Sequence, residues 1–314
     1  MSLAPYIRIV AQGKGRARAL TFEEAQAAMS LILSGNAAPE AVGALLMVLR
    51  LRGEADVEIG GFTAALRETT KAMLPTADLD WPCYSAGRTR GTPLFLLSAK
   101  LVAQAGYHVA IHGWNSHQAT GVGVRQALEQ ASLLDDKLTY SPLENLSPAA
   151  FGVLKLRDTF GLRSCINTVL RMWNPSHAPV SVQGVFHPSY RGLQSRAAAL
   201  LGDQNLTIIK GGGGEFERNP SKATEVYGLR DGSDIAMSAP AFLSETRRLH
   251  EPDRLVDVAA LWAGEPHEEF VKMTVIGTAG LALWALGAAP SLDAADEMAA
   301  KLWRDRHMAE RKSA

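Results

Sequence analysis

The sequence predicts an α/β protein in which a small helical bundle precedes a larger domain with a mainly parallel central sheet. Apolar residues recur at helical spacing through residues 1–75, and β-type runs alternate with helical segments through residues 76–314. A chain of 314 residues with 47% hydrophobic residues has enough apolar material for two domains. We therefore place the domain boundary near residue 75, and expect helices within 140–175 to complete the bundle.

The helices of the bundle are predicted from their start and stop signals. Thr21-Phe-Glu-Glu24 is a capping box, in which the Thr hydroxyl and the Glu carboxylate satisfy free N–H groups at a helix start. Pro39 opens a second helix. The apolar face of that helix consists of Val42, Leu45, Leu46 and Leu49. Residues 59–73 form a further helix, and Pro75 closes the bundle.

The second domain is predicted from three strand-like runs, at 107–111, 180–186 and 206–209. The helical segments that alternate with them are 94–105, 121–131 and 189–201. Each run ends in a loop that contains glycine or histidine. Ligands of parallel α/β sheets bind beyond the carboxyl ends of the strands, so these loops are the place to look for a site.

Composition excludes several protein classes. Lysine plus arginine and aspartate plus glutamate both total 32, so the chain is not a globally basic nucleic-acid coat. Residues 151–210 nevertheless carry seven basic and two acidic side chains. Two distant cysteines exclude a disulfide scaffold and favour a cytoplasmic location. The longest apolar stretch, 275–289, is shorter than the ~20 residues of a membrane span, so we expect a buried helix and no membrane partner.

Two loops near the first strands have residues suited to anions. The first contains Ser85, Gly87, Arg88 and Arg90. Its glycine allows close backbone approach and its arginines supply charge, although an ordinary surface turn has the same composition. The second contains His112, Gly113 and Asn115. A histidine there can donate to a phosphate or a substrate, or it can pack against Trp114.

Two later segments carry further candidates. Arg157 and Arg163 flank Gly161, which is expected to break a helix, and they predict either an arginine-lined groove or solvated helix charges. Lys210 precedes four glycines. Ordering four glycines costs much conformational entropy, so their presence indicates either the close approach of a ligand or a mobile loop. Glu215 and Glu217 follow and could hold a hard cation through oxygen ligands. No nucleophile–base pair is evident, so the catalytic residues stay unassigned.

Taken in order, these segments resemble the glycosyl transferase family that contains anthranilate phosphoribosyltransferase. The most specific part is Arg157-xxx-Gly161-x-Arg163-xxx-Asn167-xxxxxx-Asn174-Pro175, followed by Gly184-Val-Phe-His-Pro188 and Val226-Tyr-Gly-Leu-Arg-Asp-Gly232. The resemblance implies a nucleoside phosphorylase/phosphoribosyltransferase-type fold and a homodimer formed through the helical domain. It also implies that Arg157, Arg163, His112 and Asn115 match the acceptor side of the family site.

The departures from that family concern the phosphoribosyl pyrophosphate site. Cys83-Tyr-Ser-Ala-Gly87 replaces the family's Gly-Thr-Gly-Gly-Asp loop, and Pro93-Leu-Phe-Leu96 replaces its Asn-x-Ser-Thr. Ile111-His-Gly-Trp114 replaces Lys-His-Gly-Asn, and Phe216-Glu217 replaces the Asp-Glu pair that binds magnesium. The lost charge-assisted bonds contribute about 1.5–3 kcal/mol each, so we expect a degenerate site.

These departures resemble the divergent YbiB-like branch, which is linked to nucleic-acid binding without the tryptophan-pathway activity. The basic candidates for such binding are Lys14, Arg16, Arg18, Lys155, Arg157, Arg163 and Arg171. The alternative is an active pentosyl or phosphoribosyl transferase with an altered substrate and a phosphorylated pentose as donor. Magnesium is expected only if that activity is retained. A small-anion sensor or a structural dimer is a third hypothesis.

Overall fold

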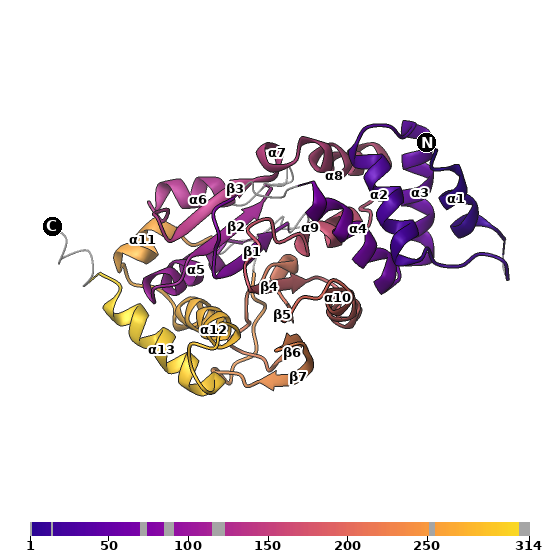
Figure 1. Ribbon diagram of the computed structural model, residues 1–314. Coiled ribbons are helices and arrows are strands. Elements are labelled where there is room, and N and C mark those ends of the chain that lie inside the picture. Colours follow the sequence, from indigo (N-terminus) through magenta and orange to yellow (C-terminus); the bar gives the residue numbers. More distant parts are fainter. Residues whose placement is uncertain are drawn as a thin grey trace.

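Seven strands form one sheet in the order β3-β2-β1-β4-β5-β6-β7 (Figure 1). The computed structural model describes residues 2–13, 15–69, 74–84, 91–114, 123–250 and 255–307. The strands are β1 (Leu79–Cys83), β2 (Val109–Gly113), β3 (Leu138–Pro142), β4 (Val180–Val185), β5 (Asn205–Lys210), β6 (Thr224–Arg230) and β7 (Ser233–Ala239). The first five are mutually parallel, and β6 and β7 are antiparallel. This confirms the predicted α/β class with a mainly parallel sheet.

The central strand β1 is one that the sequence does not predict. It contains Pro82, which has no N–H to donate to a neighbouring strand. β1 pairs with β2 over five residues, but with β4 only at Leu79 and Asp80. The strands β3 and β7 are also unpredicted, because they lie at the edges of the sheet and have mixed polar sequences. The predicted runs correspond to β2, β4 and β5.

The helices fall into two groups on opposite sides of the sheet (Figure 1). One group shares a hydrophobic core with β1 and β2 and consists of α5 (Phe95–Gln104), α6 (Val124–Gln130), α11 (Val258–Ala263), α12 (Glu269–Ala285) and α13 (Leu292–Asp305). Neighbouring residues of β5 face opposite sides of the sheet. Ile209 packs in this core, whereas Ile208 packs in a second hydrophobic core that contains the helical bundle. The apolar stretch 275–289 falls largely in the buried helix α12. No helix of the described residues is long and apolar enough to cross a membrane.

The second group is the helical bundle and the helices packed against it. It consists of α1 (Ala4–Ala11), α2 (Phe22–Leu33), α3 (Pro39–Arg52), α4 (Asp56–Glu68), α7 (Leu143–Leu146), α8 (Pro148–Phe160), α9 (Ile166–Arg171) and α10 (Ser189–Leu200). The capping box is confirmed, because Thr21 Oγ1 accepts from the Glu24 N–H at 3.2 Å and Glu24 Oε2 accepts from the Thr21 N–H at 2.9 Å. The predicted break at Gly161 is confirmed as well, since this glycine ends α8 in a left-handed conformation.

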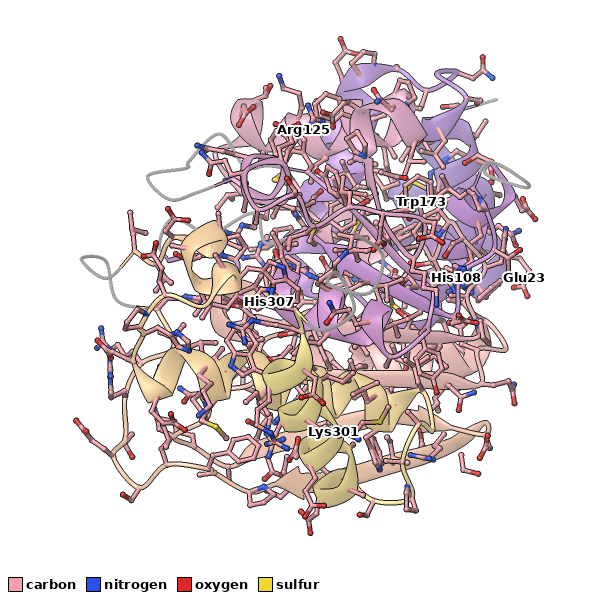
Figure 2. All side chains as sticks on the ribbon, turned by 90° about the vertical axis from the view of Figure 1, so that its left-hand side faces the viewer. Glu23, His108, Arg125, Trp173, Lys301 and His307 are labelled. Carbon is pink, nitrogen blue, oxygen red and sulfur yellow. The ribbon has the colours of Figure 1, made fainter. Side chains whose placement is uncertain are left out.

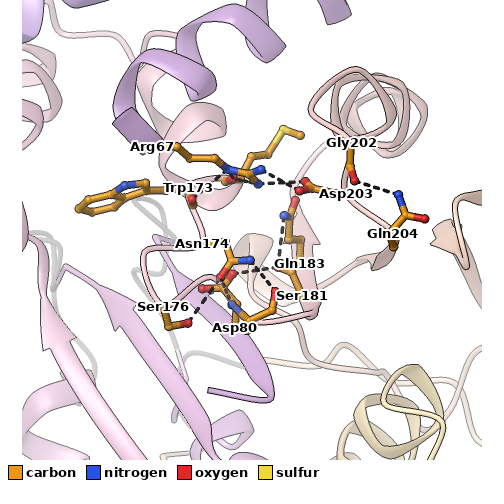
Figure 3. Close-up of polar contacts among 12 residues, drawn as sticks. Arg67, Asp80, Trp173, Asn174, Ser176, Ser181, Gln183, Gly202, Asp203 and Gln204 are labelled. Atoms are coloured by element: carbon orange, nitrogen blue, oxygen red, sulfur yellow. Dashed lines mark hydrogen bonds and ion pairs between the residues drawn. The ribbon is translucent and has the colours of Figure 1, made fainter. Parts of the chain in front are cut away.

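Arg67 at the end of α4 connects the bundle to the α/β domain (Figure 3). Its guanidinium forms two hydrogen bonds with the carboxylate of Asp203, at 2.7 and 2.9 Å. It also donates to the backbone carbonyls of Met172 and Trp173, which directly follow α9. Asp203 lies just after α10. One side chain therefore fixes the carboxyl ends of α9 and α10 relative to α4.

Substituting Gly61 is expected to disrupt the contact between α2 and α4. A Cβ atom on Gly61 would lie 2.2 Å from the Phe22 carbonyl oxygen and 2.8 Å from Ala25 Cβ. Gly61→Ala should therefore reduce the free energy of unfolding by about 1–3 kcal/mol in denaturant titrations. Gly152 in α8 has open space around it and serves as the control. Gly152→Ala should stabilise the protein by about 0.5–1 kcal/mol, and equal effects of both variants would contradict this packing.

The capping carboxylate of Glu24 should titrate at unusually low pH. The hydrogen-bonded Arg18 guanidinium and the Thr21 N–H lower the pKa of Glu24 to about 2. Because this pKa lies below that of the unfolded chain, the pair stabilises the fold above pH ~4.5 and this contribution disappears as pH falls towards 2. An NMR titration of the Glu24 carboxyl carbon should show the low value in wild type and in Arg16→Ala. Arg18→Ala should raise this pKa, and an unchanged value would disprove the role of Arg18.

Candidate functional site

A pocket of about 680 Å³ lies between the helical bundle and the α/β domain. We call it the interdomain pocket. It lies beyond the carboxyl end of β4, and α3, α8, α9 and α10 contribute its walls. Its lining residues are Arg50, Glu54, Arg157, Asp158, Gly161, Leu162, Arg163, Ser164, Asn167, Thr168, Arg171, Val185, Phe186, His187, Tyr190 and Gln194. This is the position at which parallel α/β sheets bind ligands.

Four arginines and two carboxylates give the interdomain pocket a positive charge. The arginines are Arg50, Arg157, Arg163 and Arg171, and the carboxylates are Glu54 and Asp158. Burial lowers the pKa of Arg163, and the charges of Arg157, Arg171 and Arg50 lower it further. Like charges held this close repel one another, so an anion bound among them would relieve the repulsion. The structure thus brings the predicted residues Arg157, Arg163 and Arg171 together.

The floor of the interdomain pocket contains buried polar atoms without partners. The side-chain amides of Asn167 and Gln194 are 6% and 0% exposed, and neither atom of either amide has a hydrogen-bond partner among the described residues. Arg171 is 8% exposed and donates to the carbonyls of Asn167 and Tyr84, but its Nε is without a partner there. Buried polar atoms are nearly always paired in folded proteins, so these atoms have unused hydrogen-bonding capacity at the pocket wall.

A second cavity of about 630 Å³ adjoins the first. We call it the glycine-loop groove, because residues 211–213 form part of its wall. Phe186 and His187 line both cavities and connect them. The basic residues of the groove are Arg191, Lys210, Lys222 and Arg248. Together the two cavities form a basic path across the carboxyl ends of β4 and β5, with the 51% exposed Phe186 at the junction.

Close packing in the structure requires some of the four glycines. A Cβ atom on Gly211 would lie 1.5 Å from the Glu215 carbonyl oxygen, and one on Gly184 of β4 would lie 2.1 Å from the Glu215 carbonyl carbon. Gly214 has a φ of +87° and packs close to Arg171. The loop, which includes the short 3-10 turn η1 (Gly212–Gly214), therefore folds tightly onto β4. Internal close packing is thus a further reason for glycine at positions 211 and 214, besides the ligand approach or loop mobility considered from the sequence.

Glu217 caps a helix, which does not suit the metal-binding role considered for it. Its carboxylate is fully buried, accepts from the Phe95 N–H at the start of α5 at 3.0 Å, and lies 2.7 Å from His250 Nε2. The His250 ring packs against Gly91 and Gly212. Glu215 is buried beside Arg171. No group of three or more His, Cys, Asp or Glu side chains in the described part of the chain is arranged to hold a metal.

His112 lies inside the molecule and does not line either cavity. It is fully buried on β2, and its Nδ1 forms a hydrogen bond of 2.8 Å with the Tyr84 hydroxyl. Its Nε2 lies 3.0 Å from Asp80 Oδ1, without the geometry of a hydrogen bond. Its ring packs edge-on against the fully buried Trp173, which is labelled in Figure 2. These contacts correct the expectation of a histidine exposed to phosphate. Gly113 allows β2 to approach Cys83.

The remaining predicted residues lie apart from the two cavities or outside the described residues. Lys155 is exposed on α8, with its Nζ 5.9 Å from the ring centre of Phe151. Arg16 and Arg18 are exposed on the bundle and line neither cavity, and Arg18 pairs with Glu24. Lys14, Ser85, Gly87, Arg88, Arg90 and Asn115 lie outside the described residues.

Sequence reasoning missed several lining residues. These are Arg50, Phe186, Tyr190, Arg191, Gln194, Lys222 and Arg248. Asn167 belongs to the motif quoted above but has no assigned role there. No local pattern distinguishes Gln194, because only the packing of α10 against the bundle turns it into the interdomain pocket.

Known proteins resemble this chain in sequence and in fold. Residues 4–70 match the glycosyl transferase family, helical bundle domain. An anthranilate phosphoribosyltransferase of Roseiflexus sp. (strain RS-1) is 32% identical over 258 residues, covering 78% of this chain and 71% of that protein. The anthranilate phosphoribosyltransferase structure from Thermus thermophilus has a TM-score of 0.76 at 24% identity and covers 91% of this chain and 92% of that chain.

A second solved structure is the Saccharomyces cerevisiae anthranilate phosphoribosyltransferase in complex with PRPP and Mg. It has a TM-score of 0.73 at 14% identity and covers 96% of this chain and 93% of that chain. The two structures show a common fold, and the Roseiflexus sequence shows common descent. The chain belongs to the anthranilate phosphoribosyltransferase family of glycosyl transferases.

Proposed function

We propose that this protein binds single-stranded nucleic acid along the two connected cavities and has lost the phosphoribosyl pyrophosphate site of its family. The observation that carries the proposal is the continuity of the basic path. Four arginines of the interdomain pocket lead through Phe186 and His187 to Arg191, Lys210, Lys222 and Arg248. A small phosphorylated sugar would need only one of the two cavities.

Aromatic rings along this path support a single-stranded ligand. The rings of Phe186 and His187 lie 4.8 Å apart, and those of His187 and Tyr190 lie 6.4 Å apart. Proteins that bind single strands combine a positive groove for the backbone with aromatic side chains on which bases stack. Phe186 and His187 are exposed, and Tyr190 is half-buried at the pocket wall. The row of rings and the two sets of cations therefore have the composition expected of such a surface.

The start of α5 supports the loss of the phosphoribosyl pyrophosphate site. In the resemblance described above, Pro93-Leu-Phe-Leu96 stands where the family holds ribose phosphate. Leu94, Phe95 and Leu96 are at most 4% exposed and belong to the hydrophobic core. The Glu217 carboxylate already accepts the N–H of Phe95. A helix start favours phosphate, but a fixed carboxylate there repels it, so this position no longer attracts an anion.

Binding of a fluorescent single-stranded 20-mer should weaken steeply as salt rises, because each neutralised phosphate releases counterions. Arg163→Ala in the interdomain pocket and Lys222→Ala in the glycine-loop groove should each lower the slope of log K against log salt by about 1. Lys301→Ala, exposed on α13 and labelled in Figure 2, is the control and should leave the slope unchanged. Absence of binding at low salt, or identical slopes in all variants, would refute the proposal.

Phosphoribosyl pyrophosphate should bind no better with magnesium than without it. In a functional site of this family, binding of phosphoribosyl pyrophosphate depends on bound magnesium. Here the buried Glu217 and the apolar start of α5 supply no magnesium ligands. Isothermal titration at physiological salt, with and without Mg²⁺, should give no saturable heat. Micromolar, magnesium-dependent binding would show that the donor site survives and would favour a transferase with an altered substrate.

A further inference from the structure

Two buried side-chain amides line the interdomain pocket. Asn167 lies in the first turn of α9 and Gln194 lies in the middle of α10. Both side chains line the pocket, and all four of their amide atoms are without hydrogen-bond partners among the described residues. Each amide therefore has one acceptor oxygen and one NH₂ donor at the pocket wall that no described residue uses.

This pattern suits a neutral ring edge better than an anion. A carboxylate or phosphate has only acceptor oxygens, so it would satisfy the NH₂ groups and leave the two amide oxygens facing negative charge. The edges of nucleobases present donors and acceptors side by side, and Asn and Gln side chains pair with them through both amide atoms. The amides of the floor are therefore complementary to a base, while the more exposed Arg50, Arg157 and Arg163 are complementary to phosphates.

Burial increases from the mouth of the pocket to its floor in a way that fits a nucleotide. Leu162 and Phe186 at the mouth are 53% and 51% exposed, Arg163 is half-buried, and Asn167 and Gln194 are buried. A base that enters would pass apolar side chains first and leave its phosphates near the pocket's arginines. A volume of about 680 Å³ is ample for one nucleotide.

From this arrangement we infer that the interdomain pocket receives one unstacked base of the bound strand, and that Asn167 and Gln194 hydrogen bond to its edge. The inference rests on the proposed function, since it names the part of a nucleic acid that the interdomain pocket recognises. The glycine-loop groove then holds the adjoining backbone through Lys210 and Lys222. Specificity for bases resides in the two amides, and the salt-dependent affinity resides in the cations.

The experiment compares a 12-mer that carries bases with a 12-mer of abasic residues at one salt concentration. Wild type should bind the base-bearing strand about tenfold or more tightly. The double variant Asn167→Ala/Gln194→Ala should reduce this ratio to about threefold or less while keeping the salt slope of wild type. Gln130→Ala, an exposed amide at the end of α6, is the matched control and should keep the full ratio.

A measurement on the wild-type chain avoids any effect of substitution on folding. A 2-aminopurine placed at each position of the 12-mer in turn should become protected from acrylamide quenching in the complex at one or more positions. Equal binding of the two strands, or quenching as in the free strand at every position, would overturn the base pocket and leave nucleic-acid binding intact. Failure of both strands to bind at low salt would overturn the proposed function itself.

Discussion

The guanidinium of Arg67 holds together the parts from which the interdomain pocket is built. It binds the carboxylate of Asp203 and the carbonyls that follow α9, and both partners lie at the carboxyl ends of pocket-lining helices. Asn167 and Arg171 are on α9, whereas Tyr190 and Gln194 are on α10. Both helices also pack against α4, and Arg196 of α10 pairs with Asp56 of α4, so the Arg67 contacts add to that packing. The polar floor of the pocket therefore depends on a residue that does not touch it.

The sequence predicts an element of the fold where its local signals agree with the tertiary environment of that element. The capping box at Thr21 and the break at Gly161 are local features, and both are confirmed. The strand β1 escaped prediction because Pro82 argues against a central strand, and only the two-residue pairing with β4 accommodates it. Edge strands such as β7 carry alternating polar residues whose pairing is set by β6 rather than by their own sequence.

Of the residues that line the candidate site, the sequence predicted mainly the charged ones. Arg157 and Arg163 stand out in a sequence because cations near a glycine break are conspicuous, and the structure brings them together. Gln194 sits in an ordinary helical segment, and its burial against the bundle is a property of the assembled domains. His112 shows the reverse case, since a histidine near a strand end has the local pattern of a ligand-binding residue. In the structure His112 is fully buried and contacts the hydroxyl of Tyr84 and the ring of Trp173.

The short pairing between β1 and β4 has a mechanical consequence. Hydrogen bonds join these strands only at their first two residues, so the sheet consists of two leaves, β3-β2-β1 and β4-β5-β6-β7, with a seam between them. The seam is closed near the amino ends of the strands and open towards the carboxyl ends. Arg171 bridges this opening by donating to the Tyr84 carbonyl from the helix that precedes β4. A ligand that engages Arg171 would therefore contact the side chain that ties α9, and with it the second leaf, to the end of the first.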